Sequence, residues 1–414
     1  MHSEIIILMA CWYKEDKGII RLKTILFVIS PFISFIYGLF SLKTKTTYIV
    51  MFFFFLVFGL SFTVGTDRLE QGLDGVAYRV MFEESKKQTT ESFLSDFHDF
   101  ITFQALQSDF YAETMVFVVS RFTYNYHYLF FSFALVLGSF TLLCLRYLTK
   151  SDYFKQTILC FILFFLFTKI QIFSINGCRF YTAFWIAAYC IFRIIIDRAK
   201  SPHLLLFITP FIHGAFWFLI IVLYFILLTK RFEKSWFVIY CVGFVLSSYV
   251  VDLMNASESV MPSFIPVRFL NYLSDYKQAQ IADDESMRTT LGAIIMFINK
   301  AYFFMIPILM KFKSTEIKTN EKAKSVYLFL IPYCAICNIF TIVPLLGARF
   351  LSLAYPFYAY IWVEGMKCKY YKWFIYLMPI VMVRDIYYML YNYTRVLEFD
   401  FFYQNIFYLL YKYA

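Results

Sequence analysis

Two arginines are the residues best suited to bind an anion, because each opens an apolar stretch of the chain. Arg179 follows Ser174-Ile-Asn-Gly-Cys, and Arg349 follows Leu346-Gly-Ala. The guanidinium group is planar, stays protonated and presents a fork of donors that matches phosphate oxygens. An arginine at the end of an apolar run can also snorkel to lipid headgroups, and for either residue alone that alternative stays open. Two arginines at one site would suit phosphate or pyrophosphate.

A histidine and two carboxylates could transfer protons. His213 lies between Pro210 and Gly214 in a long apolar run, and an imidazole with an ordinary pKa of about 6.5 can act as a general base. Asp67 follows a Gly-Thr pair, and Glu113 opens the segment before a later apolar run. The structural alternatives are a packed core histidine, solvated loop acids and helix caps. No second His or Cys lies at metal-ligand spacing, so we expect no metal ion.

The composition decides which elements must position these residues. Of 414 residues, 61% are hydrophobic and only 16% are charged, and the mean hydropathy is +0.65, values that exclude a water-soluble domain. The 23% aromatic content also excludes a disordered chain or a porin-like barrel with alternating strands. The net charge of +10 comes from Lys and Arg in short breaks between apolar runs, so nucleic-acid binding is not expected.

Ten apolar runs approach the length of a membrane span, which predicts an all-α polytopic integral membrane protein. The basic breaks between runs should be cytoplasmic, so two long loops, about 65–127 and 254–290, should face outward. We expect an N-terminal tail over residues 1–24, lying at the membrane interface, and a single membrane domain over 25–414. The predicted spans are 25–42, 47–64, 128–145, 157–173, 179–196, 236–253, 291–310, 326–343, 349–363 and 373–391.

Two segments do not fit a simple alternation of spans. The apolar run 204–228 has basic breaks at both ends, so one crossing cannot satisfy both, and Pro210 and Gly214 favour a re-entrant helical hairpin with His213 at its tip. The N-terminal tail should be outside by the same alternation, although it carries Lys17 and Arg21. The sequence offers no explanation for that tail.

Other motifs add little chemistry. Arg268, in the second predicted outer loop, is flanked by aromatic residues that could hold a sugar face, although a solvated loop position is the simpler interpretation. Cys334 and Cys337 form a C-x-x-C inside an apolar run, where packing is the expected role. Glycine-rich phosphate loops and nucleophile elbows are missing from the sequence, so we expect no nucleotide or other cofactor.

The order of these features resembles the EpsG-type branch of the Wzy polysaccharide polymerases, which are bacterial inner-membrane proteins of capsule, O-antigen and exopolysaccharide synthesis. The likeness covers about residues 25–365. The chain departs from the family pattern where Ser61-Phe-Thr63 replaces a common Arg and where Arg68-Leu-Glu70 replaces a common Tyr. The motifs that carry the resemblance are Val64-Gly-Thr-Asp67, Tyr78-Arg-Val-Met-Phe82, Glu113, Asn176-Gly-Cys-Arg179, His213-Gly-Ala and Arg349.

The resemblance implies a glycosyltransferase that joins undecaprenyl-pyrophosphate-linked repeat units without a metal or cofactor, with its active face outward from the inner membrane. It also implies the bilayer, the lipid-linked oligosaccharides, a chain-length regulator and a flippase as partners. A ligase-like glycan transferase and a lipid-linked oligosaccharide flippase or transporter remain alternatives. His213, or failing it Glu113, would take the acceptor proton. The expected site residues are catalytic His213, Glu113 and Asp67 and substrate-binding Arg179, Arg349, Arg268 and Tyr78.

Overall fold

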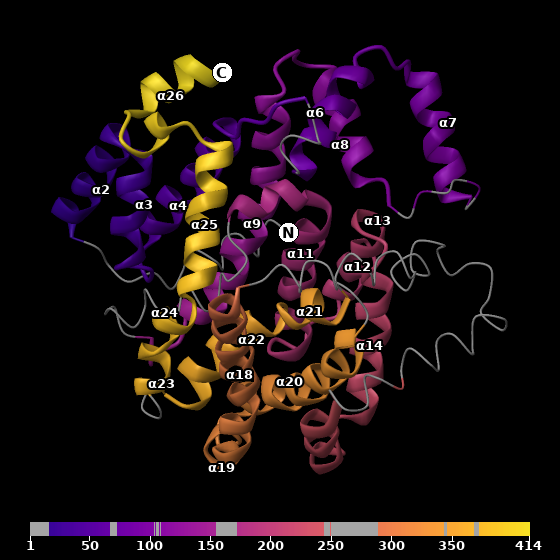
Figure 1. Cartoon of the computed structure of the whole chain (residues 1–414), viewed down its shortest axis with the longest axis vertical. Coiled ribbons are helices and arrows are strands. Elements are labelled where there is room, and N and C mark those ends of the chain that lie inside the picture. The colour runs from indigo at the N-terminus through magenta and orange to yellow at the C-terminus, as the bar shows by residue number, and fades with distance from the viewer. Residues whose placement is uncertain are drawn as a thin grey trace.

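The computed structural model describes residues 16–66, 73–102, 104, 107, 109–154, 172–243, 249, 289–342, 346–367 and 372–414. Within these ranges every regular element is a helix (Figure 1), so the predicted all-α class is confirmed. Asp67, Arg268, nearly all of the predicted loop 254–290 and most of the predicted span 157–173 lie outside the described residues. The helices described in full are α2 (Lys17–Ile29), α3 (Pro31–Leu39), α4 (Lys45–Leu60), α6 (Asp74–Ser85), α7 (Thr90–Ile101), α8 (Tyr111–Ser120), α9 (His127–Thr149), η1 (Ile172–Gly177), α11 (Cys178–Ile195), α12 (Pro202–Leu206), α13 (Thr209–Ile212), α14 (Phe216–Thr229), α18 (Thr290–Phe312), α19 (Ser314–Ile317), α20 (Glu321–Ile339), η2 (Phe340–Ile342), α21 (Leu346–Leu351), α22 (Ala354–Tyr360), η3 (Ile361–Gly365), α23 (Lys372–Tyr376), α24 (Met378–Val381), α25 (Val383–Val396), η4 (Phe399–Phe402) and α26 (Ile406–Tyr413).

Three helices in the described ranges are long and apolar enough to cross a membrane: α9, η1 with α11, and α18. A fourth span forms if α23 and α24 are joined to α25 across a bend of 48°. The prediction of ten spans is therefore not confirmed. The other described apolar helices are shorter or broken, and several of them form pairs of short arms instead of single crossings.

The predicted span 25–42 is broken at Ser30–Pro31, which separates α2 from α3. Pro31 has no N–H and forces the preceding residue out of the helical region, and Ser30 is extended, with φ −157° and ψ 111°. The Ser30 hydroxyl also caps α3, because it accepts a hydrogen bond from the Ile33 N–H at 3.2 Å. The chain therefore starts a new helix where the sequence predicted a continuous one. The predicted boundary at residue 24 falls inside α2.

This break explains the basic N-terminal segment that did not fit the alternation. Lys23 of α2 is buried and donates hydrogen bonds to the hydroxyls of Thr44 and Thr47, each at 2.8 Å, at the start of α4. The tip of the α2–α3 pair lies elsewhere, where the Ser30 hydroxyl donates to the Phe402 carbonyl at 3.1 Å. The helix pair as a whole thus starts and finishes near the start of α4. The positive-inside rule then places the beginning of α2 on the same side as the basic residues before α4.

The run 204–228 forms a helical hairpin. One arm contains α12 and α13, the other is α14, and rings contact each other across the pair at His203 with Tyr224 and at Phe211 with Trp217. These contacts are centred on residues 213 and 214, so the chain reverses at the predicted tip. The depth of this hairpin in a membrane stays a prediction.

The predicted span 349–363 is also divided, into α21, α22 and η3. Pro356 lies in the first turn of α22 and has no N–H for the carbonyl one turn earlier, at Ser352, which favours the start of a new helix here. Tyr355 N–H bonds that carbonyl in a turn instead, at 3.1 Å. The consequence is that α21 is a short separate helix, and Arg349 lies in its last turn.

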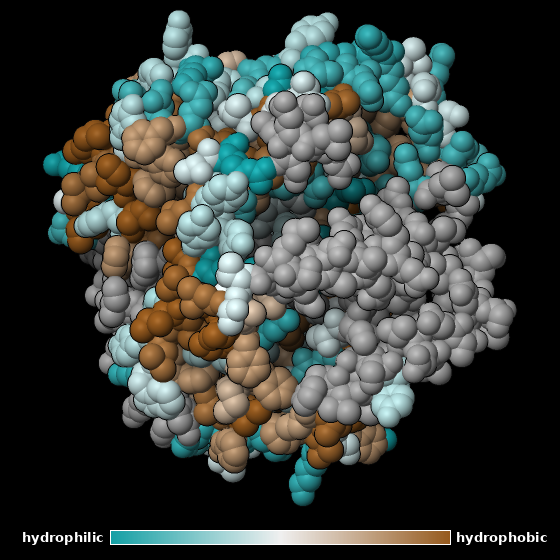
Figure 2. All heavy atoms as spheres, viewed as in Figure 1, coloured by the Kyte–Doolittle hydropathy of each residue, from teal (hydrophilic) through white to brown (hydrophobic). Residues whose placement is uncertain are grey.

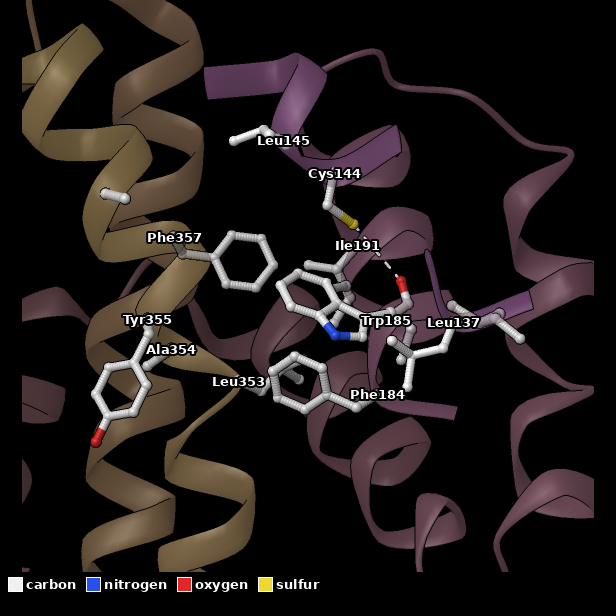
Figure 3. Close-up of a cluster of buried hydrophobic side chains, with 14 of the residues drawn as sticks. Leu137, Cys144, Leu145, Phe184, Trp185, Ile191, Leu353, Ala354, Tyr355 and Phe357 are labelled. Carbon is white, nitrogen blue, oxygen red and sulfur yellow. Dashed lines mark hydrogen bonds between the residues drawn. The ribbon is translucent and has the colours of Figure 1, made fainter. Parts of the chain in front are cut away.

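Close backbone contact holds the central helices together. A Cβ atom on Gly59 of α4 would lie 2.6 Å from the Cβ of Ala134 in α9, so only glycine permits this approach, which is typical of helix pairs in membranes. Figure 3 shows the adjoining core, where Trp185 of α11 lies among side chains of α9 and α22 and its carbonyl accepts from the Cys144 thiol at 3.6 Å. This core supports the first turn of α11, which carries Arg179.

The outside of the molecule differs from region to region. Figure 2 shows hydrophobic surface over α2 and in the area of α24, where exposed side chains include Ile25 and Ile380. Hydrophilic side chains gather at the opposite upper edge, around α7. A helix that exposes apolar side chains on this scale needs lipid around it, so the exposed apolar faces agree with a membrane protein.

Candidate active site

Arg179 lies where a 3-10 helix meets a membrane span. The η1 turn ends at Gly177 and α11 begins at Cys178, which places Arg179 in the first turn of that span. The η1 turn is anchored to the start of α6, because the Asn176 side-chain oxygen accepts a hydrogen bond from the Gly75 N–H at 2.9 Å. The first turn of α11, which carries Arg179, is thus tied through η1 to α6.

The Arg179 guanidinium pairs with Asp109, a residue that the sequence analysis did not single out. Nη1 of Arg179 donates to Oδ1 of Asp109 at 3.0 Å, and the two side chains are 33% and 3% exposed. Tyr78 of α6 is buried beside Arg179. One signal could have revealed the pair: a buried arginine needs a counter-ion, and Asp109 is an acid directly before the aromatic pair Phe110-Tyr111.

His213 lies at the tip of the hairpin, next to the same arginine. Its backbone is extended, with φ −154° and ψ 114°, because it ends α13 and Gly214 starts the turn into α14. Its Nδ1 accepts a hydrogen bond from the Ala215 N–H at 3.3 Å. The imidazole meets the ring of Phe180 edge-on, with 5.3 Å between centroids, and Phe180 directly follows Arg179.

Arg349 approaches the same phenyl ring from α21. Its guanidinium carbon lies 5.6 Å from the centroid of Phe180, a distance typical of a cation–π contact. Gly347 makes this approach possible: a Cβ there would lie 2.5 Å from the carbonyl oxygen of Phe340. The structure therefore brings Arg179, His213 and Arg349 together around Phe180, although they come from three separate segments, α11, the hairpin and α21 (Figure 1).

Glu113 belongs to a neighbouring cavity. It lies in the first turn of α8 and lines a cavity of about 260 Å³ with Glu84, Asp96, Phe93 and Phe110. The amide side chains of Gln88 and Gln107, together with Ser85, complete its polar lining. The segment 109–110 lies between this cavity and Arg179, since Asp109 pairs with Arg179 while Phe110 lines the cavity. Such a cavity, with carboxylates, amides and phenyl rings, has the mixed lining of a small-molecule site.

These features define a helical membrane protein in which Arg349 and His213 contact Phe180, next to the ion pair of Arg179 with Asp109. The match to a family model is more specific: the model for the EpsG family covers residues 48–412, and the chain belongs to that family. The resemblance inferred from the sequence is thereby confirmed. No curated protein and no solved structure shows a significant match to the chain.

Proposed function

We propose that the protein is a glycosyltransferase of the bacterial inner membrane that polymerises undecaprenyl-pyrophosphate-linked oligosaccharide repeat units into a surface polysaccharide. Membership of the EpsG family supports the class of reaction. The observation that carries the proposal is that Arg349 and His213 both contact the ring of Phe180, the residue that directly follows Arg179 on α11. Two permanent cations at one place suit a doubly charged leaving group better than a neutral or singly charged one.

In the proposed reaction, a hydroxyl oxygen of the acceptor glycan attacks the anomeric carbon of the donor sugar. The bond between that carbon and the pyrophosphate oxygen breaks, undecaprenyl pyrophosphate leaves, and the hydroxyl proton passes to a base of the protein. Negative charge therefore grows on the pyrophosphate as the bond breaks. Arg179 and Arg349 stabilise this charge, and groups fixed in place before the reaction are the most effective at doing so.

His213 fits the role of a hydrogen-bond donor in this site. Because its Nδ1 accepts from the Ala215 N–H, the proton of the neutral imidazole is on Nε2. An Nε2–H group can donate to a phosphate oxygen beside the arginines, but it cannot accept a proton at that nitrogen. We therefore assign the acceptor proton to Glu113, the second candidate from the sequence.

The cavity that Glu113 lines supplies a place for the acceptor glycan. Gln88 and Gln107 can hydrogen-bond sugar hydroxyls, and the rings of Phe93 and Phe110 can pack against the apolar face of a sugar. Three carboxylates in one lining disfavour an anionic sugar, because like charges repel at short range. The acceptor end is therefore proposed to be a neutral or amino sugar.

The test uses a strain that lacks this gene, complemented with wild type, Arg349→Ala, Arg179→Ala or Lys318→Ala. Lys318 is a matched control, since it is also a cation paired with a carboxylate, Glu233, in a separate cluster. Gels of surface polysaccharide and of lipid-linked intermediates are compared. Wild type and Lys318→Ala should restore the polymer ladder, while both arginine variants should leave single repeat units on lipid at the outer face.

Three outcomes would contradict the proposal. A full ladder with both arginine variants would remove the arginines from the reaction. Repeat units trapped at the cytoplasmic face of the deletion strain would indicate a flippase. Long polymer that accumulates on undecaprenyl pyrophosphate would indicate a ligase.

A further inference from the structure

Asp109 is a buried carboxylate in the segment that leads into α8. Its side chain is 3% exposed, and its Oδ1 accepts a hydrogen bond from Nη1 of Arg179 at 3.0 Å. An ionised group removed from water loses several kcal/mol of hydration unless an opposite charge and hydrogen bonds compensate. The partner of Asp109 is therefore a requirement of the fold, and the two residues stay together when no substrate is bound.

The segment that carries Asp109 is also tied to the hairpin. The Phe110 N–H donates to the Phe211 carbonyl at 3.0 Å, two residues before His213. On its other side the Phe110 ring stacks on Phe100 of α7, with 5.3 Å between centroids. The backbone at 109–110 is thus held between α7 and α13, so the position of the carboxylate is set independently of Arg179.

A carboxylate fixed in this way controls how the arginine is oriented. The guanidinium group is planar, so a hydrogen bond at Nη1 to a fixed carboxylate restricts the directions in which the remaining N–H donors point. A third of the Arg179 side chain is exposed, and a ligand can reach it from that side. We propose that Asp109 is a positioning residue, which holds the Arg179 fork in the plane required for a bidentate grip on the donor pyrophosphate.

This inference rests on the proposed function and adds a residue to it. Asp109 also balances the charge of Arg179, with which it is paired. Without the carboxylate, the site would attract an anion at least as strongly but would hold the guanidinium group less firmly. The loss is therefore expected in kcat, which depends on alignment in the transition state, and not in KM.

The experiment uses the purified full-length protein in vesicles of bacterial lipid. The probe is the lipid-linked single repeat unit extracted from the deletion strain, and chain growth is measured against its concentration. Misalignment by about 1 Å costs about 100-fold in rate, so Asp109→Ala should lower kcat by about that factor, with KM within about 3-fold of wild type. Asp109→Asn keeps an acceptor oxygen for Nη1 and should recover about 10-fold of the loss.

A double variant shows whether Asp109 acts through Arg179. If it does, Asp109→Ala combined with Arg179→Ala should be no slower than Arg179→Ala alone. The double variant should also melt at a higher temperature than Arg179→Ala, which deprives the buried carboxylate of its guanidinium partner. Glu233→Gln is the control for loss of an ion-paired carboxylate elsewhere, and its kcat should equal that of wild type.

Several results would overturn the positioning role. These are an unchanged kcat in Asp109→Ala, a further fall in kcat when Asp109→Ala is added to Arg179→Ala, or equal kcat in folded Asn and Ala variants. If Asp109→Ala does not fold, the kcat of Asp109→Asn against Glu233→Gln decides the question, and an unchanged value refutes the role. A wild-type protein that extends no chains would refute the proposed function instead.

Discussion

Two clusters in this protein each combine carboxylate and basic side chains, yet they use them differently. In the first, which we call the Arg179 cluster, Asp109 pairs with Arg179, and Arg349 lies beyond the ring of Phe180. In the second, the Glu233 cluster, one carboxylate holds both cations: Glu233 accepts from Lys311 at 2.7 Å and from Lys318. The helix α14 separates the two, and its 14 residues span about 21 Å.

The comparison shows how similar charges can serve stability or ligand binding. The Tyr327 hydroxyl also donates to Glu233, at 2.9 Å, so three donors converge on that carboxylate. They join the helical segment that follows α14 to α18, to the segment after α19 and to α20. In the Arg179 cluster, Asp109 forms an ion pair with Arg179, and Arg349 lies over the ring of Phe180. Lysines are compact point charges, whereas arginines offer a planar fork for phosphate. The Glu233 cluster therefore links helices, and the Arg179 cluster is the one that we propose to bind an anion.

Of the substitutions that test this contrast between the two clusters, those at His213 are expected to have the largest effect on polymer formation. Removal of one donor aimed at developing charge usually costs about 100-fold or more, so His213→Ala should lower polymer formation by that amount. His213→Gln retains an amide N–H donor and should lose only about 10-fold. Chain growth in vesicles measures both variants. Equal losses in Gln and Ala would mean that the ring transfers a proton, and the donor role would be abandoned.

A smaller effect is expected from Gly347, which tests whether packing sets the position of the second arginine. A Cβ at this residue would lie 2.6 Å from the backbone N of Thr341, so α21 must shift and carry Arg349 with it. Overpacking of this kind costs about 2 kcal/mol, and we expect a roughly 10-fold slower rate. The matched control is Gly292→Ala, whose Cβ would meet only the Thr289 hydroxyl at 3.2 Å. Wild-type melting and activity in Gly347→Ala would show that α21 is not constrained there.

The smallest effect on activity is expected from Glu233→Gln, which should change stability alone. Partial burial by itself raises the pKa of Glu233, but hydrogen bonds from Lys311, Lys318 and Tyr327 outweigh it and lower the pKa from the ordinary 4.5 to about 2. Because the folded pKa is depressed, the stabilisation is complete above about pH 4.5 and is lost as the pH falls towards 2.

At pH 7 the variant should be about 1–2 kcal/mol less stable, a value reduced because the carboxylate lies near solvent. Thermal unfolding in detergent at pH 7 and at pH 3 measures the difference between variant and wild type. That difference should shrink at the lower pH. A difference that stays constant would show that the ion pairs do not carry it, and a lower kcat would link the two clusters.

Three of the residues that the sequence singled out lie near one another in the structure, and their roles stay predictions. Arg179, His213 and Arg349 lie together, and each could be found locally, from an arginine that opens an apolar run or a histidine between proline and glycine. Glu113 lies at a separate cavity, and Asp67 and Arg268 are outside the described residues. Asp109 was missed because its partner is 70 residues away, and no local pattern encodes that contact.

By itself, the sequence determined the all-α class, the apolar surface for a membrane and the family, because these follow from composition and from motifs that can be read residue by residue. It also determined the reversal at His213, since proline and glycine act on the backbone next to them. The tertiary structure alone decided how the arms α2 and α3 pack against α4 and that three segments meet at Phe180. These features depend on contacts between distant residues, such as Lys23 with Thr47, and burial of a charge is settled only when its partner is in place.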